Sequence, residues 1–291
     1  MLPRLNAIQA LRAIAANLVV AEHLWSIDGK YTGGRILPDT LATIGQFGVD
    51  IFFVISGVIM AMLAKDADWR SFLWARVTRI YPIYWFYSAI VLILYFSVPT
   101  IVNSSFSAAP SIWKSFALWP DAQLPLLMVG WTLIHEMYFY LVVAVMIALR
   151  VNLVAGVAVW AVVLLFPVDR NYPVLAVVFS PFTYLFIGGM LLGGALRKPS
   201  FSTLVEQIPV PRFLIIFGDA SYSTYLGHIL VLSMLGRLYA LLSAPTSFVL
   251  HVLFLLTCVV AANIVGLVSF RYLEVPTTAL TRGVRQRFQV A

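Results

Sequence analysis

The chain has 291 residues, of which 62% are hydrophobic and only 11% are charged. Charged residues make up about a quarter of an average soluble domain, so the composition excludes a soluble globular protein and indicates an integral membrane protein with several spans. The net charge of +7 does not indicate nucleic-acid binding, because the basic residues lie between apolar segments, as the positive-inside rule predicts. The single cysteine, Cys258, excludes an intrachain disulfide.

The first apolar segment, residues 5–25, is predicted to be a membrane-spanning helix with two ionisable side chains on one face. Arg12 and His23 are 11 residues apart, and at about 100° per residue this separation returns to nearly the same side of a helix. Charged groups in hydrocarbon are costly and usually face a bundle interior or a wet cavity. We therefore expect Arg12 and His23 to belong to a functional site. The alternative is that both lie near helix ends and reach the membrane surface.

The second apolar segment, residues 44–64, is predicted to cross the membrane and contains an isolated carboxylate. Asp50 lies inside the run GVDIFFVISG, where burial of a charge is costly, so it is a candidate catalytic residue. Gly48 and Gly57 in the same segment predict that a neighbouring helix approaches closely.

Residues 65–79 combine basic side chains with aromatic residues at helical spacing. This pattern predicts an amphipathic helix at the membrane surface that leads into the third span, and this span is expected to begin at Ile80. The long segment of residues 103–125, which contains Trp113 and Trp119, is expected to form an ordered cap or a re-entrant segment.

The fourth, fifth and sixth spans are predicted at residues 126–149, 151–168 and 172–196. The fourth contains GWTLIHEMYFY, in which Glu136 is a second buried carboxylate and a candidate catalytic residue. Trp131 in the same run is a candidate for substrate binding. The small-residue tract GGMLLGGA of the sixth span predicts close helix packing.

The seventh and eighth spans are predicted at residues 213–242 and 247–270. In the seventh, SYSTYLGH places four side chains at i, i+3, i+4 and i+7, on one face of a helix: Ser221, Thr224, Tyr225 and His228. Tyr225 and His228 are interpreted either as substrate-binding groups or as a hydrogen-bonded packing pair.

The distribution of basic residues predicts the orientation of the chain. Most of the 19 lysines and arginines lie in alternate joints between spans, which places both termini in the cytoplasm. Four ionisable side chains then lie in the outer half of the membrane: His23, Asp50, Glu136 and His228. Three arginines gather at the inner face: Arg76, Arg79 and Arg271. A polyanionic ligand from the cytoplasm would meet these arginines there.

Six tracts follow one another in the order found in a known family. They are the R-x10-H of Arg12 and His23, GVDIFFVISG, RVTRIYPIYW, GWTLIHEMYFY, SYSTYLGH and RYLEVP. Together they resemble the acyltransferase type 3 family of bacterial membrane proteins over nearly the whole chain, and within it the ExoZ-like exopolysaccharide acetyltransferases. The resemblance implies one integral membrane acyltransferase domain over residues 1–291, built as an all-α bundle of about eight to ten spans.

The resemblance also implies roles for individual residues. Arg12 and His23 are expected to be essential for catalysis. Arg76 and Arg79, which form an R-x-x-R motif, are expected to handle the acyl donor, acetyl-CoA or another acyl-CoA, and Arg271 is a weaker candidate for the same role. The implied acceptor is a hydroxyl of an exopolysaccharide or lipid-linked glycan at the bacterial inner membrane.

O-acyl transfer requires a base that takes the proton from the acceptor hydroxyl and a thioester carbonyl that can be polarised. His23 is the best candidate for the base, because a neutral imidazole accepts a proton. Asp50, Glu136 or His228 could hold its tautomer or bind the sugar. Direct transfer to the sugar and transient acylation of His23 both stay open.

Other interpretations of these residues also stay open. Arg76 and Arg79 fit basic anchors at the inner membrane surface equally well, and His135 and His251 fit structural roles better than chemical ones. No metal site is expected, because the histidines are scattered and there is no cysteine pair. A glycolipid transporter or flippase with a buried proton relay is the alternative from another class, and a non-catalytic membrane assembly factor is a weaker one.

Overall fold

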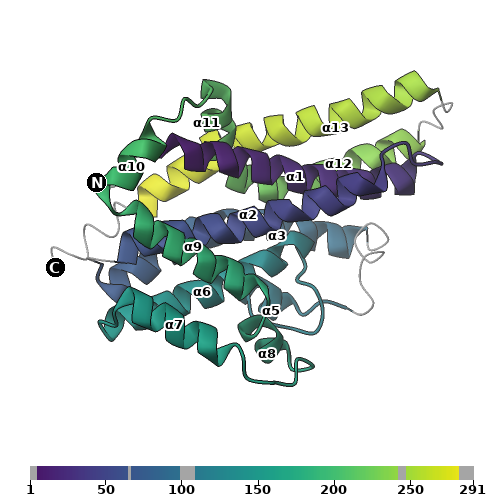
Figure 1. Ribbon diagram of the computed structural model, residues 1–291. Coiled ribbons are helices and arrows are strands. Elements are labelled where there is room, and N and C mark those ends of the chain that lie inside the picture. The colour runs from purple at the N-terminus through teal and green to yellow at the C-terminus, as the bar shows by residue number, and fades with distance from the viewer. Residues whose placement is uncertain (1–4, 65–66, 99–108, 242–246, 282–291) are drawn as a thin grey trace. The chain divides into compact units, whose positions relative to one another are not determined.

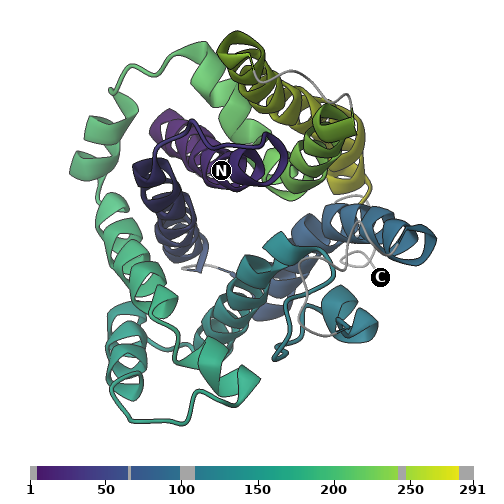
Figure 2. The same cartoon turned by 90° about the vertical axis from the view of Figure 1, so that its right-hand side faces the viewer.

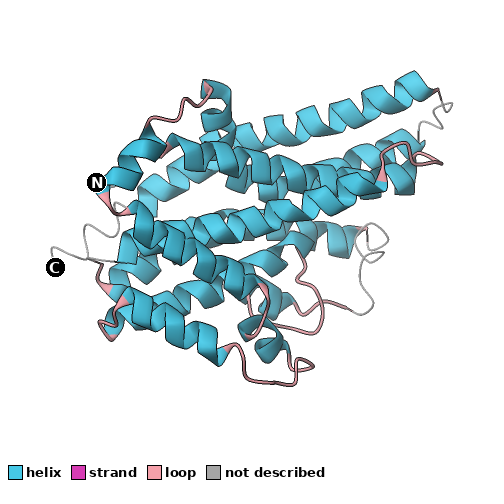
Figure 3. Ribbon diagram, viewed as in Figure 1, coloured by secondary structure: helices cyan, strands magenta, loops and turns pink. Residues whose placement is uncertain are grey.

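The computed structural model describes residues 5–64, 67–98, 109–241 and 247–281. All regular secondary structure within these residues is helical, and none of it is strand (Figure 3). Six helical segments are long and apolar enough to cross a membrane: Asp39–Ala64, Trp69–Ser97, Met128–Ala148, Pro173–Leu196, Ser221–Leu241 and Phe248–Thr281. The prediction of an all-α, multi-pass membrane protein is confirmed.

The described residues do not reach the predicted count of eight to ten spans. Helix α1 (Asn6–Tyr31) has 26 residues, but it is not among the six segments that are apolar enough to span a membrane. Helix α7 (Leu153–Val163) has 11 residues, about 16 Å of helix, which is shorter than the roughly 30 Å of a hydrocarbon core. The predicted span at residues 151–168 is therefore a shorter helix.

The prediction that the third span begins at Ile80, after an amphipathic surface helix, is wrong. A single helix, α3, runs through this region from Trp69 to Ser97. The Asp68 side chain caps its start by accepting a 2.9 Å hydrogen bond from the Ser71 N–H. No glycine or proline follows before Ile80, so nothing in the sequence ends the helix there.

The expectation that residues 103–125 are ordered is confirmed for their described part, residues 109–125, and a cap and a re-entrant segment both fit it. This part contains the short helix α5 (Ile112–Ala117). Three side chains of α3 donate hydrogen bonds of 2.7–2.9 Å to its carbonyl groups: Tyr81, Tyr84 and Trp85. Residues 103–108 of the predicted cap lie outside the described residues.

The predicted seventh span is divided into two helices. Helix α11 (Arg212–Asp219) ends at Asp219, and α12 (Ser221–Leu241) begins after the single residue Ala220. Glycine, aspartate and serine, which make up most of the joint, are poor residues for a helix interior. Gly218 also lies against the backbone of Gln9, and this contact fixes α11 on α1.

The chain divides into two compact units. The central unit contains residues 53–205, and the terminal unit contains residues 5–52 together with residues 206–281. Helix α2 (Asp39–Ala64) contributes its first part to the terminal unit and its remainder to the central unit.

The central unit is built around helices α3 and α6 (Trp131–Ala148), which pack against each other. The other described elements of this unit are the second part of α2, α5, α7, η2 (Met128–Gly130), α8 (Pro173–Val178), α9 (Phe182–Leu196) and nearly all of α10 (Pro199–Glu206). Gly57, Gly189 and Gly193 bring α2 and α9 so close that a Cβ on any of them would meet a carbonyl oxygen of the facing helix. The predicted close packing of Gly57 and of the GGMLLGGA tract is confirmed.

In the terminal unit α1 packs against α11 and α12, and α12 packs along α13 (Phe248–Ser269). Figures 1 and 2 show α1, α12 and α13 side by side. Helix α13 continues into a π-helical turn, η3 (Phe270–Glu274). Gly48 lies against the Ala15 carbonyl of α1, which confirms the predicted close approach at this glycine.

Candidate functional site

His23 lies on α1, inside the terminal unit, with one ring nitrogen fixed by the helix backbone. Its Nδ1 is 3.0 Å from the carbonyl oxygen of Val19, one turn earlier. Because a carbonyl oxygen only accepts hydrogen bonds, Nδ1 carries the hydrogen and Nε2 has a free lone pair. The sequence predicted the helix correctly, and the structure adds that the tautomer of His23 is the one in which Nε2 can accept a proton.

A second imidazole, His228 of α12, lies directly beside the first. The two ring centroids are 4.9 Å apart, with 77° between the ring planes. His228 is completely buried, and its Nδ1 is 2.7 Å from the Tyr225 carbonyl oxygen. Its Nε2 has no hydrogen-bond partner among the described residues. The pair therefore offers two neighbouring nitrogen acceptors, one on the half-buried His23 ring and one on the buried His228 ring.

The predicted polar face of α12 is confirmed, since all four of its members are buried: Ser221, Thr224, Tyr225 and His228. The Tyr225 ring packs edge to face on Phe52 of α2, at 5.7 Å between centroids. Next to this face, the Ser223 hydroxyl donates a 2.7 Å hydrogen bond to the buried Glu274 carboxylate of η3. This bond joins the SYSTYLGH and RYLEVP tracts, a pairing that sequence reasoning missed.

Three other predicted site residues, Arg12, Asp50 and Arg271, belong to the terminal unit. Arg12 is buried, with 9% of its surface exposed, and it lies on the same helix as His23. Asp50 is partly buried on α2 and has no hydrogen bond or ion pair with the described residues. Arg271 is exposed on η3. No contact within the described part of this unit brings Asp50 or Arg271 to the His23 and His228 rings.

A second polar constellation, in the central unit, is built around Glu136 of α6. Its Oε1 accepts a 3.1 Å hydrogen bond from the Ser56 hydroxyl of α2 and a short one from the Tyr140 hydroxyl. Tyr140 is i+4 from Glu136, so the helical spacing alone could have indicated this contact. Ser56 is 80 residues away in sequence and carries no local signal for the pairing.

Arg76 of α3 extends this constellation. Its guanidinium lies within electrostatic reach of Tyr140, Glu136 and Arg79. The Nε atom of Arg76 is buried and has no hydrogen-bond partner among the described residues. The central unit thus brings two predicted residues of different roles, Glu136 and Arg76, into one cluster. A buried guanidinium with an unused N–H fits an anionic or carbonyl oxygen of a ligand.

Trp131 lies in an aromatic cluster at the start of α6. Its ring contacts His135 edge to face at 5.6 Å and Phe182 at 5.4 Å between centroids. The His135 Nδ1 is 3.0 Å from the Trp131 carbonyl oxygen. These contacts support the structural interpretation of His135, and substrate binding by Trp131 stays a prediction.

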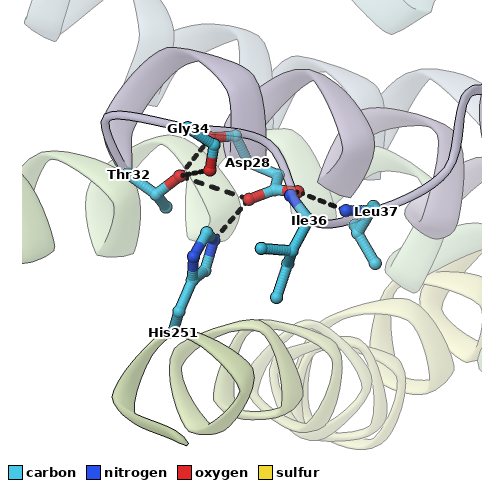
Figure 4. Close-up of polar contacts among 6 residues, drawn as sticks. All are labelled: Asp28, Thr32, Gly34, Ile36, Leu37 and His251. Atoms are coloured by element: carbon cyan, nitrogen blue, oxygen red, sulfur yellow. Dashed lines mark hydrogen bonds and ion pairs between the residues drawn. The ribbon is translucent and has the colours of Figure 1, made fainter. Parts of the chain in front are cut away.

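His251 of α13 also has a structural partner, which sequence reasoning missed. Its Nε2 forms a short ion pair with the completely buried carboxylate of Asp28, near the end of α1 (Figure 4). The other Asp28 oxygen accepts hydrogen bonds from the backbone N–H groups of Ile36 and Leu37, at 2.9 and 2.8 Å. Thr32 contacts the same carboxylate. Asp28 therefore fixes the connection between α1 and α2.

The part of the chain that the structure describes contains no group of three or more histidine, cysteine, aspartate or glutamate side chains that could hold a metal ion. The two constellations above instead offer an imidazole pair in one unit and an arginine and carboxylate cluster in the other. Both fit acid–base chemistry and the binding of a negatively charged ligand.

Comparisons with known proteins identify the chemistry. The family profile described as "Acyltransferase domain" matches residues 5–217. The chain is 27% identical to the exopolysaccharide production protein ExoZ of Rhizobium meliloti, over 84% of this chain and 92% of that protein. It is 31% identical to the acyltransferase MdmB of Streptomyces mycarofaciens, over 47% of this chain and 38% of that protein. No solved structure matches the chain.

The family match covers Arg12, His23, Glu136 and the R-x-x-R arginines, and it ends just before α12. It favours the enzyme over the glycolipid transporter among the functions that the sequence left open. The chain belongs to the acyltransferase type 3 family and is a membrane acyltransferase.

Proposed function

We propose that this chain transfers an acetyl group from acetyl-CoA to a hydroxyl of an exopolysaccharide or a lipid-linked glycan. The similarity to an exopolysaccharide production protein over most of both chains supports a glycan acceptor. The whole chain acts as a single integral membrane domain in the bacterial cytoplasmic membrane, with both termini in the cytoplasm. The arginines of the basic tail that support this orientation, Arg282, Arg285 and Arg287, lie outside the described residues.

The observation that carries the proposal is the free Nε2 of His23. With Nδ1 bonded to the Val19 carbonyl, Nε2 takes the proton from the acceptor hydroxyl. The hydroxyl oxygen attacks the thioester carbonyl carbon, the carbon–sulfur bond breaks, and CoA leaves as a thiolate that receives a proton. His23 acts as the general base or, in a two-step version, carries the acetyl group on Nε2 before the acceptor removes it.

The arginines supply the positive charge that the donor requires. Arg76 and Arg79 bind acetyl-CoA from the cytoplasmic side, and Arg271 is a weaker contributor. Arg12, buried on the same helix as His23, takes part in catalysis along the path of the donor. These roles are supported by the unused N–H of Arg76 and by the affinity of guanidinium groups for phosphate and carbonyl oxygens.

Five further residues have proposed roles, with Asp50 and Glu136 acting in catalysis and His228, Tyr225 and Trp131 contacting the acceptor. The support is uneven among them. His228 touches the His23 ring, and Tyr225 holds His228. For Asp50 the support is the cost of placing a carboxylate in an apolar segment. For Trp131 it is the tendency of aromatic rings to lie at binding surfaces.

The experiment that tests the proposal measures CoA release from acetyl-CoA by the purified full-length protein, with a glycan acceptor present. His23→Ala is expected to abolish release while the protein is still produced and inserted. Glu22→Gln, on the next residue of α1, is the matched control and is expected to stay active. Full activity of His23→Ala would refute the role of His23. Movement of labelled glycan across liposomes without CoA release would instead identify a transporter.

A further inference from the structure

The central unit contains a cavity of about 530 Å³ that the proposed reaction does not yet use. It lies where α2 and α6 end, where α7 begins and just beyond the end of α9, and its lining includes Ala64, Ile147, Leu153 and Arg197. The sequence predicted the joints after α2, α6 and α9 on the same side of the membrane, the cytoplasmic side. A volume of this size is typical of small-molecule sites.

Two arginines give the cavity a positive charge. Arg150 and Arg197 both line it, and no described carboxylate lies within ion-pair distance of either guanidinium. The Nη2 atom of Arg197 is buried without a hydrogen-bond partner among the described residues. Buried donors normally have partners, so an unused guanidinium N–H beside a cavity points to an anionic ligand.

Arg150 occupies a backbone position that usually holds glycine. Its φ is 52°, in the left-handed region that side chains disfavour. The hydrogen bonds from Arg150 N to the Ile147 oxygen and from Val151 N to the Met146 oxygen, both 3.0 Å, form the Schellman ending of α6. Glycine is the ordinary choice at this position, so an arginine here puts a guanidinium at the cavity at a conformational cost.

One face of α6 connects this cavity with the Glu136 cluster. Glu136, Tyr140, Val143 and Ile147 are spaced by four, three and four residues, which places them on one side of the helix. Val143 and Ile147 line the cavity, and Tyr140 lies within electrostatic reach of Arg76. The distance along the axis from Glu136 to Ile147 is about 16 Å. A long ligand with its phosphates in the cavity could therefore present its other end to Arg76.

We propose that this cavity binds the phosphate-bearing nucleotide end of the acyl-CoA donor, with Arg150 and Arg197 contacting phosphate oxygens. The inference rests on the proposed function and deepens it, because it moves Arg76 and Arg79 toward the thioester end of the donor. The apolar wall formed by Val143 and Met146 receives the adenine ring. An anionic phospholipid headgroup offers the same phosphate chemistry. We favour the acyl-CoA donor as the ligand, because one face of α6 leads from the cavity to the cluster that contains Arg76.

The test measures CoA binding without turnover, using the full-length protein in nanodiscs of phosphatidylcholine. Arg150→Gln and Arg197→Gln are each expected to raise the Kd for CoA about tenfold, the loss of one charge-assisted contact. The Kd for pantetheine, which has no phosphate, is expected to stay unchanged. Arg170→Gln, an exposed arginine of the same unit that does not line the cavity, is the matched control and should bind CoA like the unaltered protein.

Arg150→Gly separates ligand binding from folding. Glycine adopts the left-handed backbone of this position without strain, so this variant should be at least as stable as the unaltered protein and still bind CoA more weakly. An unchanged Kd for CoA in Arg150→Gly and Arg197→Gln overturns the proposal. The variants are also placed in nanodiscs of phosphatidylcholine mixed with phosphatidylglycerol. If they bind phosphatidylglycerol more weakly while their Kd for CoA is unchanged, the proposal is overturned and the cavity binds lipid.

Binding and turnover keep this inference apart from the proposed function. If CoA binding depends on Arg150 and Arg197 but the protein releases no CoA from acetyl-CoA, the nucleotide site is supported and the proposed transfer reaction is refuted. If the protein releases CoA and the KM for acetyl-CoA is the same in all variants, the reaction is supported and the nucleotide site is refuted.

Discussion

The His228 ring lies edge to face against the His23 ring, with 4.9 Å between centroids. Both rings use Nδ1 to bind a backbone carbonyl of their own helix, so both present Nε2. The edge-to-face contact restrains the orientation of the His23 ring. We therefore infer that His228 positions His23, in place of the acceptor contact proposed for it above, and kinetics separate the two roles.

This inference predicts that His228→Gln lowers kcat for acetyl transfer by about tenfold or more, because general base catalysis contributes about 10²–10⁴-fold and depends on the placement of the base. The KM values for acetyl-CoA and for the glycan should change little. Steady-state kinetics on both substrates decide the matter. A raised KM for the glycan with an unchanged kcat would return His228 to the substrate-binding role.

The second prediction concerns the Tyr140 hydroxyl, which bonds Glu136 and lies within electrostatic reach of Arg76. Tyr140→Phe removes a bond to a charged group and frees Arg76 to move, so the KM for acetyl-CoA should rise about three- to tenfold. Tyr138→Phe is the matched control on the same helix, because the Tyr138 hydroxyl accepts a hydrogen bond from Trp160 instead. Equal KM values in both variants would contradict the prediction.

The same assay separates the two interpretations of the R-x-x-R motif. Arg76→Ala and Arg79→Ala should raise the KM for acetyl-CoA if these arginines handle the donor. An unchanged KM, with less protein in the membrane, would identify them as positive anchors of α3.

The third prediction concerns stability. The Asp28 carboxylate is completely buried and pairs with His251 while holding two backbone N–H groups (Figure 4). Breaking a buried pair by altering one partner typically costs about 3–5 kcal/mol. Asp28→Asn should therefore lower the free energy of unfolding by about that amount, measured by denaturant titration in detergent. Asp169→Asn, on an exposed loop residue, should stay within about 0.5 kcal/mol.

A double-mutant cycle with His251→Gln tests whether the two side chains act as a pair. The double variant should be less destabilised than the sum of the two single variants, because the remaining partner is no longer left as an uncompensated buried group. Strict additivity would show that Asp28 acts through the backbone N–H groups alone.

Patterns within short stretches of the sequence predicted the features of the fold that depend on residues close to one another in the chain. Composition gave the membrane class, helical periodicity gave the buried face from Ser221 to His228, and small residues gave the close approach at Gly57. The contacts between Asp28 and His251 and between Ser56 and Glu136 join residues 223 and 80 positions apart. No local spacing encodes such pairs, since they arise when helices pack.

The boundaries of the helices were less predictable than their existence. The sequence of residues 65–79 is amphipathic, yet the Asp68 cap and the absence of a break before Ile80 make residues 69–79 one helix with the third span. The left-handed backbone of Arg150 also has no local signal, because arginine is not a residue type that indicates this conformation.

The last prediction uses two adjacent glycines of α9 that differ only in the direction they face. A Cβ on Gly189 would collide with the Val54 carbonyl of α2, whereas a Cβ on Gly188 would have no atom within 4 Å. Gly189→Ala must separate two helices that touch through their backbones, and overpacking of this kind costs about 1–3 kcal/mol. Gly188→Ala should instead be neutral or raise stability by up to about 1 kcal/mol, because alanine favours the helix. Unfolding measurements in the same detergent compare the pair directly. Equal stabilities of Gly189→Ala and Gly188→Ala would show that α2 and α9 are not held together by this contact.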